Sequence, residues 1–243
     1  MANNLLHHLF NFRLFILLIL VFIAFTVIGT ISHETGHYVM ARFFGFKASI
    51  HYNYTIPQID QKEREFFKTS WKKYPSQIKA NQPFPEKDRY DRIVNQYKRA
   101  GIWITWGGPL QTMLTGTIGL ILLILLRKRY FSSERLSFWL WFIIFITLFW
   151  LRQTTNFIMA ISSAIIRGSF KGFGDESDLA RHYNLPEWSI SAITALIGVA
   201  ILISVIFKFI PSKQRLTFIF AGLVGGISGF VFWLVLFGRM IMP

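Results

Sequence analysis

The sequence predicts an all-α polytopic membrane protein with about five transmembrane helices, a short β element and a charged loop after the first helix. Three observations support this fold class. The chain has 243 residues, of which 53% are hydrophobic, and a mean hydropathy of +0.42, well above that of soluble proteins. Its apolar residues form runs long enough to cross a bilayer, which takes about 20 residues per helix. Cysteine is absent, which excludes disulfide scaffolds, thiolate metal sites and cysteine nucleophiles.

The five apolar runs predict membrane helices over residues 14–44, 102–126, 136–166, 189–210 and 216–237. The first run is too long for a signal peptide and lacks a clear small-residue cleavage site, so we interpret it as a retained helix. The last run contains overlapping small-xxx-small patterns, which favour helix packing; their glycines are Gly222, Gly225, Gly226 and Gly229. We expect one membrane-embedded domain over residues 1–243, with residues 46–99 inserted as a loop between the first two helices.

The formal charge of +14 does not indicate nucleic-acid binding, because the basic residues lie between the apolar runs. There they indicate membrane orientation and attraction to anionic lipid. The side with the long loop and the C-terminus contains 16 Lys and Arg residues, and the opposite side contains 8. We therefore expect the richer side to face the cytoplasm, in a bacterial inner membrane. The long loop dominates this balance.

The inserted loop begins with an alternating pattern over residues 48–56, which predicts a strand. The strand is either an edge that pairs with an unwound substrate backbone or part of an interfacial hairpin whose tyrosines lie among lipid headgroups. Residues 61–99 are charged and interrupted by proline, and residues 87–100 favour a helix. We interpret this segment as a surface cover.

A metal-binding pattern lies at the end of the first apolar run, where His33 is followed by Glu34 and, four positions on, by His37. Two histidines at this spacing project from one face of a helix and can bind one zinc ion. Glu34 can then act as the general base on a water that the zinc activates. Ionisable residues within a membrane are costly and usually functional.

A catalytic zinc site normally has a third protein ligand, and the acidic segment after the third apolar run supplies two candidates. Asp175 and Asp178 both emerge on the membrane side where His33 and His37 lie. The third run is polar near that end, from Arg152 to Asn156, so this face should line the protein interior. The second run enters from the same side at Gly108-Pro109, where glycine permits close helix approach.

With these residues the chain resembles the site-2 protease family of intramembrane zinc metalloproteases, as a small member without a PDZ domain. The resemblance rests on three patches: the histidine motif followed by Ala41-Arg42 and Gly45, Gly108-Pro109, and residues 175–186. It implies a zinc ion held by His33, His37 and Asp175, with Asp175 rather than Asp178 as the ligand. Asn156 resembles one of the family's asparagines. Asn156 or Arg152 either steadies the oxyanion or the substrate backbone or forms hydrogen bonds between helices, and the second role is favoured for Arg152. Three places depart from the family pattern: Glu176 replaces a glycine, Gln111-Thr112 replace an expected asparagine, and no proline follows Asn156, whose distance to Asp175 is longer.

The resemblance implies a zinc metalloendopeptidase, a hydrolase that cleaves peptide bonds in or near transmembrane segments of protein substrates. Its partners are then membrane proteins and lipid, with no nucleic acid; the oligomeric state is left open. Three alternatives remain. A zinc protease of another class would use a glutamate as third ligand, for which Glu176 and Glu187 are the later candidates. A di-iron desaturase needs further histidine boxes, which His7, His8, His51 and His182 do not form. A non-catalytic scaffold or transporter with the same fold is the third.

Overall fold

The computed structural model describes residues 10–130, 136–168 and 174–243, without the side chains of residues 128–130. Five helices in this part of the chain are long and apolar enough to cross a membrane. They span Phe12–Phe43, Lys87–Arg127, Phe138–Arg167, Ser189–Phe209 and Ser212–Ile241. The predicted all-α membrane fold is therefore confirmed. His7, His8, most of the turn expected after residue 127, and residues 169–173 before the acidic segment lie outside the described residues.

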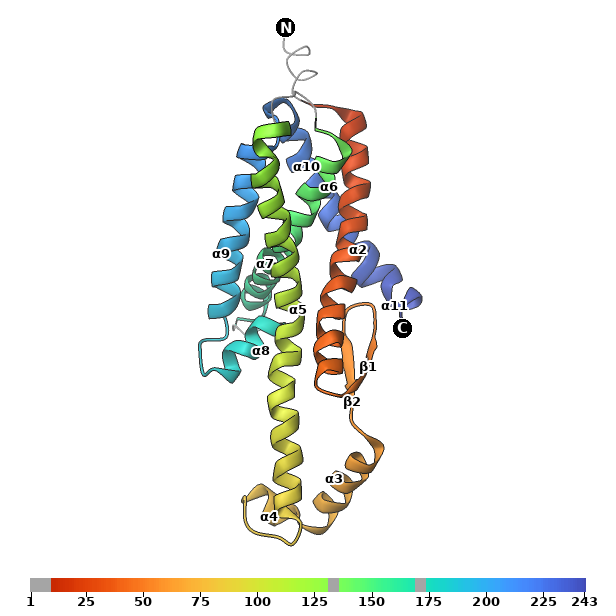
Figure 1. The fold of residues 1–243 in the computed structure, drawn as a ribbon, viewed down its shortest axis with the longest axis vertical. Helices are drawn as coiled ribbons and strands as arrows, with labels where there is room; N and C mark the ends of the chain where they lie inside the picture. The colour runs from red at the N-terminus through yellow and green to blue at the C-terminus, as the bar shows by residue number, and fades with distance from the viewer. Residues whose placement is uncertain (1–9, 131–135, 169–173) are drawn as a thin grey trace.

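The spans run along the long axis of the molecule (Figure 1). The first is α2 (Phe12–Phe43), and the second belongs to α5 (Lys87–Tyr130). The third comprises α6 (Phe138–Thr147), the 3₁₀ turn η1 (Leu148–Trp150) and α7 (Leu151–Arg167). The fourth is α9 (Ser189–Ser204) with the π turn η2 (Val205–Phe209). The fifth comprises α10 (Ser212–Phe230), the π turn η3 (Val231–Phe237) and α11 (Gly238–Ile241).

The second membrane helix begins earlier than its apolar residues predict. The helix expected over residues 87–100 and the span expected from residue 102 form one continuous helix, α5. No proline or turn sequence separates them, so the backbone hydrogen bonds continue from the polar part into the apolar part. Pro109 lies inside this helix.

The single strand predicted over residues 48–56 is wrong: these residues form a hairpin, in line with the hairpin alternative. Strand β1 (Lys47–Ile50) pairs antiparallel with β2 (Thr55–Gln58), with Ile50 opposite Thr55. The chain reverses between them, where the N–H of His51 donates to the carbonyl of Tyr54 at 2.9 Å. Alternation of apolar and polar residues persists across a short turn, so the pattern alone does not locate the reversal.

The larger apolar cluster lies in the half of the bundle that is distant from the histidine motif, and a smaller one of Ala41, Phe46 and Ala100 lies just beyond that motif. In the larger cluster, Leu18 and Phe22 of α2 pack against Ile144 of α6 and Phe218 of α10. Three of the four glycines of the predicted packing pattern face α2: a Cβ on Gly222 or Gly225 would contact Phe22, and one on Gly229 would contact Thr26. A Cβ on Gly226 would meet open space. The larger cluster thus fixes α2 against α10.

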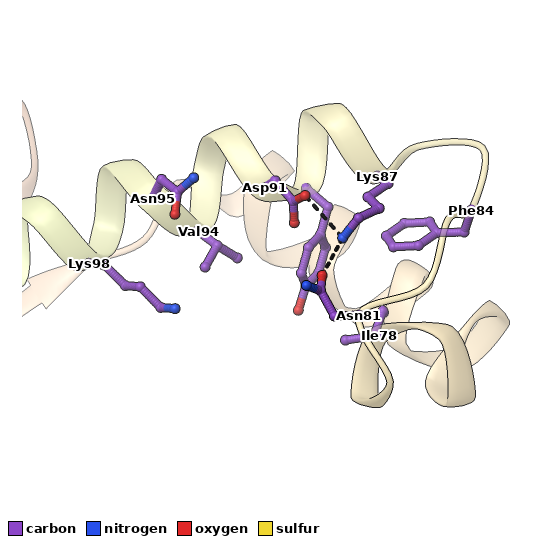
Figure 2. A pocket seen from close by; sticks show the side chains of 9 residues that line it. Ile78, Asn81, Phe84, Lys87, Asp91, Val94, Asn95 and Lys98 are labelled. Carbon is purple, nitrogen blue, oxygen red and sulfur yellow. Dashed lines mark hydrogen bonds and ion pairs between the residues drawn. The ribbon is translucent and has the colours of Figure 1, made fainter.

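The inserted loop forms a helical extension beyond the bundle (Figure 1). It comprises α3 (Gln61–Lys73), α4 (Pro75–Lys79) and the first turns of α5. A surface pocket lies at the end of this extension, where Lys87 contacts Asp91 at 3.1 Å and Asn81 at 2.5 Å (Figure 2). None of the residues that line this pocket belongs to the histidine motif or to the acidic segment.

Candidate metal centre

His33 and His37 lie one turn apart on α2 and point their Nε2 atoms at each other. The two nitrogens are 3.2 Å apart, and both residues are buried, at 1% and 8% exposure. The Nδ1 of His37 lies 2.6 Å from the carbonyl oxygen of Ile104 on α5. This contact requires the proton on Nδ1, which leaves the Nε2 lone pair free to bind a metal.

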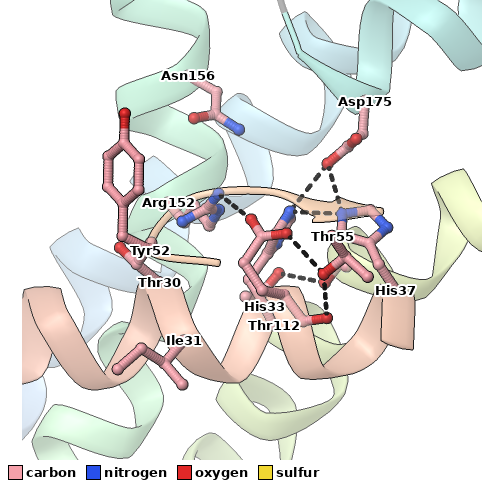
Figure 3. A network of polar contacts seen from close by, with 12 residues as sticks. Thr30, Ile31, His33, His37, Tyr52, Thr55, Thr112, Arg152, Asn156 and Asp175 are labelled. Carbon is pink, nitrogen blue, oxygen red and sulfur yellow. Dashed lines mark hydrogen bonds and ion pairs between the residues drawn. The ribbon is translucent and has the colours of Figure 1, made fainter. Parts of the chain in front are cut away.

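Asp175 completes a triangle of ligand atoms with the two histidines (Figure 3). Its Oδ2 lies 2.8 Å from His33 Nε2 and 3.3 Å from His37 Nε2. Asp175 is the first residue of α8 (Asp175–His182). It follows Gly174, whose φ of +87° is a conformation that favours glycine. This turn directs the first side chain of α8 back towards α2.

The charge state of Asp175 suits a metal ligand. Burial alone raises the pKa of its carboxyl, but the contacts with His33 and His37 outweigh burial and hold the pKa well below its usual range. The side chain is therefore a carboxylate at neutral pH. Metal ligands must be deprotonated in this way.

The spacing of the three ligand atoms fits a tetrahedral ion. Metal–ligand bonds of about 2.0–2.2 Å place two tetrahedral ligand atoms about 3.3–3.6 Å apart, close to the 2.8, 3.2 and 3.3 Å found here. Gly108 of α5 lies against this site, and a Cβ on it would overlap the Nε2 atoms of both histidines. Within the described part of the chain, His33, His37 and Asp175 form the one group that could hold a metal ion.

The other acidic residues of this segment point elsewhere. Asp178 forms an ion pair with Arg181 at the surface, and Glu187 lies 3.6 Å from the same arginine. Glu176 is buried and receives weak contacts of 3.4 Å from the Asn156 amide. Burial, and next the charge of Asp175, raise the pKa of Glu176. Of the acidic residues in this segment, the structure therefore brings Asp175 to the histidines, and not Asp178, Glu176 or Glu187.

Glu34 lies beside the ligands, 3% exposed, between a hydroxyl and a guanidinium. The Thr55 hydroxyl of β2 is 2.9 Å from the Glu34 backbone carbonyl and 3.1 Å from its Oε2. Arg152 Nη2 of α7 is 3.9 Å from Oε1. Figure 3 shows Thr55 and Arg152 approaching from the hairpin and from α7. Thr55 was not predicted as a site residue, although it lies on the polar face of the alternating segment.

Asn156 lies one turn beyond Arg152 on α7, and its hydrogen bonds among the described residues are to Glu176. The sequence predicts that Arg152 and Asn156 lie at the same end of the membrane spans as His33. The contact between Arg152 and Glu34 agrees with this prediction. Of the two, Arg152 is the residue in contact with Glu34. Asn156 instead contacts Glu176, which follows the ligand Asp175 in the chain.

The α5 helix closes the site from the remaining side. The backbones of Gly36 and Gly107 approach so closely that a Cβ on Gly36 would overlap the Gly107 carbonyl. It would also lie 2.8 Å from the Gln111 Cβ. The carbonyls of Gly108 and Pro109 accept the Thr112 hydroxyl at 3.2 and 2.9 Å, and Gln153 of α7 donates to Thr112 at 3.2 Å. Polar residues from α2, α5 and α7 thus converge here, as the sequence predicts.

Comparisons of the chain with protein-family models, with curated proteins and with solved structures found no match.

Proposed function

We propose that this protein is an intramembrane zinc metalloprotease that hydrolyses peptide bonds in or near transmembrane segments of other proteins. The proposal rests mainly on one observation: Glu34 lies beside a triangle of two imidazole nitrogens and one carboxylate oxygen, at the end of an apolar helix. Such a ligand set with an adjacent glutamate is the arrangement of zinc hydrolases.

Zinc suits the ligands better than a hard cation does. Ca²⁺ and Mg²⁺ prefer oxygen ligands, whereas two imidazoles and one carboxylate favour zinc or a similar transition metal. Three protein ligands leave a fourth position open, as catalytic zinc sites require. When bound, zinc would activate a water molecule and polarise the scissile carbonyl.

Glu34 would take a proton from that water and deliver it to the leaving amine. Its two oxygens are held differently, because Oε2 faces the Thr55 hydroxyl and Oε1 faces Arg152. Two fixed contacts restrict the carboxylate to few rotamers. A general base that is already oriented needs less reorganisation during the reaction.

Arg152 is the favoured group for stabilising the oxyanion. Its side chain is partly buried near the ligands, at 26% exposure, and its buried Nε has no hydrogen-bond partner among the described residues. A fixed positive charge in a poorly solvated site stabilises developing negative charge strongly. Asn156 would orient Glu176 or the substrate backbone, because its amide faces Glu176.

The substrate class follows from the surroundings of the site. Three of the apolar spans, α2, α5 and α7, contribute residues to it, so a peptide bond reaches it most directly from a membrane segment or its end. A substrate helix hides its amides in its own hydrogen bonds and must unwind before hydrolysis.

The test is cleavage of a single-pass reporter by purified, zinc-loaded protein. Glu34→Gln should lower the cleavage rate at least about 100-fold, because it removes a general base. Glu65→Gln, an exposed glutamate on α3, is the matched control and should cleave like wild type. Equal cleavage by Glu34→Gln and wild type would refute the proposal, and no cleavage of any reporter by the wild type would favour a scaffold or transporter.

A further inference from the structure

We propose that the last membrane helix positions Glu34 through the hairpin, with Trp233, which binds the turn, and Thr55, which binds Glu34, as positioning residues. This inference rests on the proposed function, since it assigns Glu34 the role of general base. It starts from a connection that the catalytic role does not require: near its turn the hairpin contacts both Glu34, through Thr55, and the last span, through Tyr52.

The last span and the residue after it form hydrogen bonds with the backbone of the hairpin turn. The indole Nε1 of Trp233 donates to the carbonyl of Tyr52 at 2.8 Å, and the N–H of Tyr52 donates to the carbonyl of Met242 at 3.1 Å. Trp233 is buried, at 3% exposure. Both peptide groups of Tyr52 are thus hydrogen-bonded to the last span and the residue that follows it, so movement of this part of the chain moves the turn.

Two local features of the last span, a π-helical segment and a glycine, allow this contact. Trp233 lies in η3, a π turn, and such turns often occur at functional sites. Gly238 follows it, and a Cβ there would overlap the Trp233 carbonyl and lie 2.9 Å from the Tyr52 ring. A glycine is therefore needed for α11 to lie against the hairpin.

Three residues after Tyr52, Thr55 contacts Glu34. Pairing of Ile50 with Thr55 and the hydrogen bond from His51 to Tyr54 stiffen the turn between Tyr52 and Thr55. The Thr55 hydroxyl has one proton and two acceptors in range, the carbonyl and the carboxylate of Glu34. A small shift of β2 therefore decides whether the Thr55 hydroxyl donates its hydrogen bond to the carboxylate or to the backbone carbonyl of Glu34.

The alternative is that the hairpin contacts the last span only for stability. Stability alone predicts that Trp233 variants change the amount of folded protein but leave the turnover of the folded fraction unchanged. Positioning predicts a lower kcat at unchanged zinc content and unchanged KM. The two are separable by measurement.

The first experiment measures hydrogen exchange of residues 47–58 in the full-length protein by mass spectrometry. Trp233→Phe keeps the ring packing but removes the donor, and Gly238→Ala displaces α11; both should accelerate exchange in the hairpin about tenfold. Gly226→Ala, where a Cβ meets open space, is the control and should exchange like wild type. Wild-type exchange in Trp233→Phe would overturn the connection, and that variant decides the matter if Gly238→Ala does not fold.

The second experiment measures kcat and KM on the reporter at equal zinc content. Thr55→Val should lower kcat about tenfold by removing one hydrogen bond to a charged group, and Thr55→Ser should restore it. Trp233→Phe should lower kcat about threefold. Because both residues act through one hairpin, the double variant should be no slower than Thr55→Val alone.

Multiplied losses in the double variant, or a wild-type kcat in Thr55→Val, would overturn the positioning role. A wild-type protein that binds zinc but cleaves nothing would instead refute the proposed function and with it that role. The exchange experiment would in that case still decide whether the last span holds the hairpin.

Discussion

At the scale of single residues, the site depends on atoms that the fold brings together from distant positions. His33 and Asp175 are 142 positions apart, yet their side chains lie 2.8 Å from each other. The residues on either side of Asp175 prepare it: Gly174 turns the chain, and the buried Glu176 faces α7. The residues next to Asp175 in the chain therefore account for its position.

Metal binding should consequently depend on Asp175 and not on Asp178. We expect His33→Ala and Asp175→Ala to reduce the zinc content of the purified protein from about one ion per chain to a small fraction, because two ligands bind zinc far more weakly than three. Elemental analysis by mass spectrometry measures this. Asp178→Ala, which removes only a surface ion pair, is the matched control; zinc loss in this variant with retention in Asp175→Ala would reverse the assignment.

Part of the site could be predicted at this scale. The spacing of His33 and His37 indicates a metal helix by itself, because four residues make about one turn. The choice between Asp175 and Asp178 came from a resemblance, since two carboxylates three residues apart are equivalent in sequence. Thr55 gave no signal, because its contact with Glu34 depends on where the hairpin turns.

At the scale of elements, the site requires that α2 and α5 approach closely. Gly36 and Gly107 face each other at the crossing, and Gly108 lies against the histidine nitrogens. Larger residues here would separate the helices or enter the metal site. The Gly-Pro pattern thus predicted close packing, although it did not identify Gly36 as the partner.

Gly36→Ala should accordingly destabilise the protein. The added methyl group would overlap the Gly107 carbonyl, and overpacking of this kind costs about 1–3 kcal/mol. A thermal melt in detergent should show a lower Tm. Gly29→Ala on the same helix, where a Cβ meets nothing within 4 Å, should leave the Tm near that of wild type; an equal fall in both variants would contradict the packing argument.

Boundaries of elements were predicted less well than their existence. Hydropathy marks the apolar part of α5 but not its polar first turns, because a helix continues for as long as its backbone bonds do. The reversal between β1 and β2 was likewise hidden by the alternation. Both errors concern where an element begins or ends, and the second one concealed the contact between Thr55 and Glu34.

At the scale of the whole molecule, the metal centre lies at one end of the bundle and the larger apolar cluster in the other half. The larger cluster stabilises α2 against α10, which leaves the end with the site free to present polar groups. This separation explains why a hydrophobicity pattern predicts the spans but not how their polar ends meet. The contacts between α2, α7 and α8 depend on tertiary packing of all five spans.

The distribution of basic residues predicts that the site end faces the cytoplasm. The chain has no cysteine, so single cysteines introduced at exposed positions report on this directly. Lys79→Cys on α4 should react with a membrane-impermeant maleimide only after permeabilisation, whereas Ser212→Cys at the start of α10 should react in intact cells. The reverse labelling would place the site on the other side.

The most direct test of the central claim is X-ray absorption at the zinc edge of the purified protein. We predict about two imidazole nitrogens and one carboxylate oxygen at about 2.0–2.2 Å from the ion, with the imidazole signal reduced in His37→Ala. A protein that binds no zinc, or a spectrum without histidine ligands, would contradict the account.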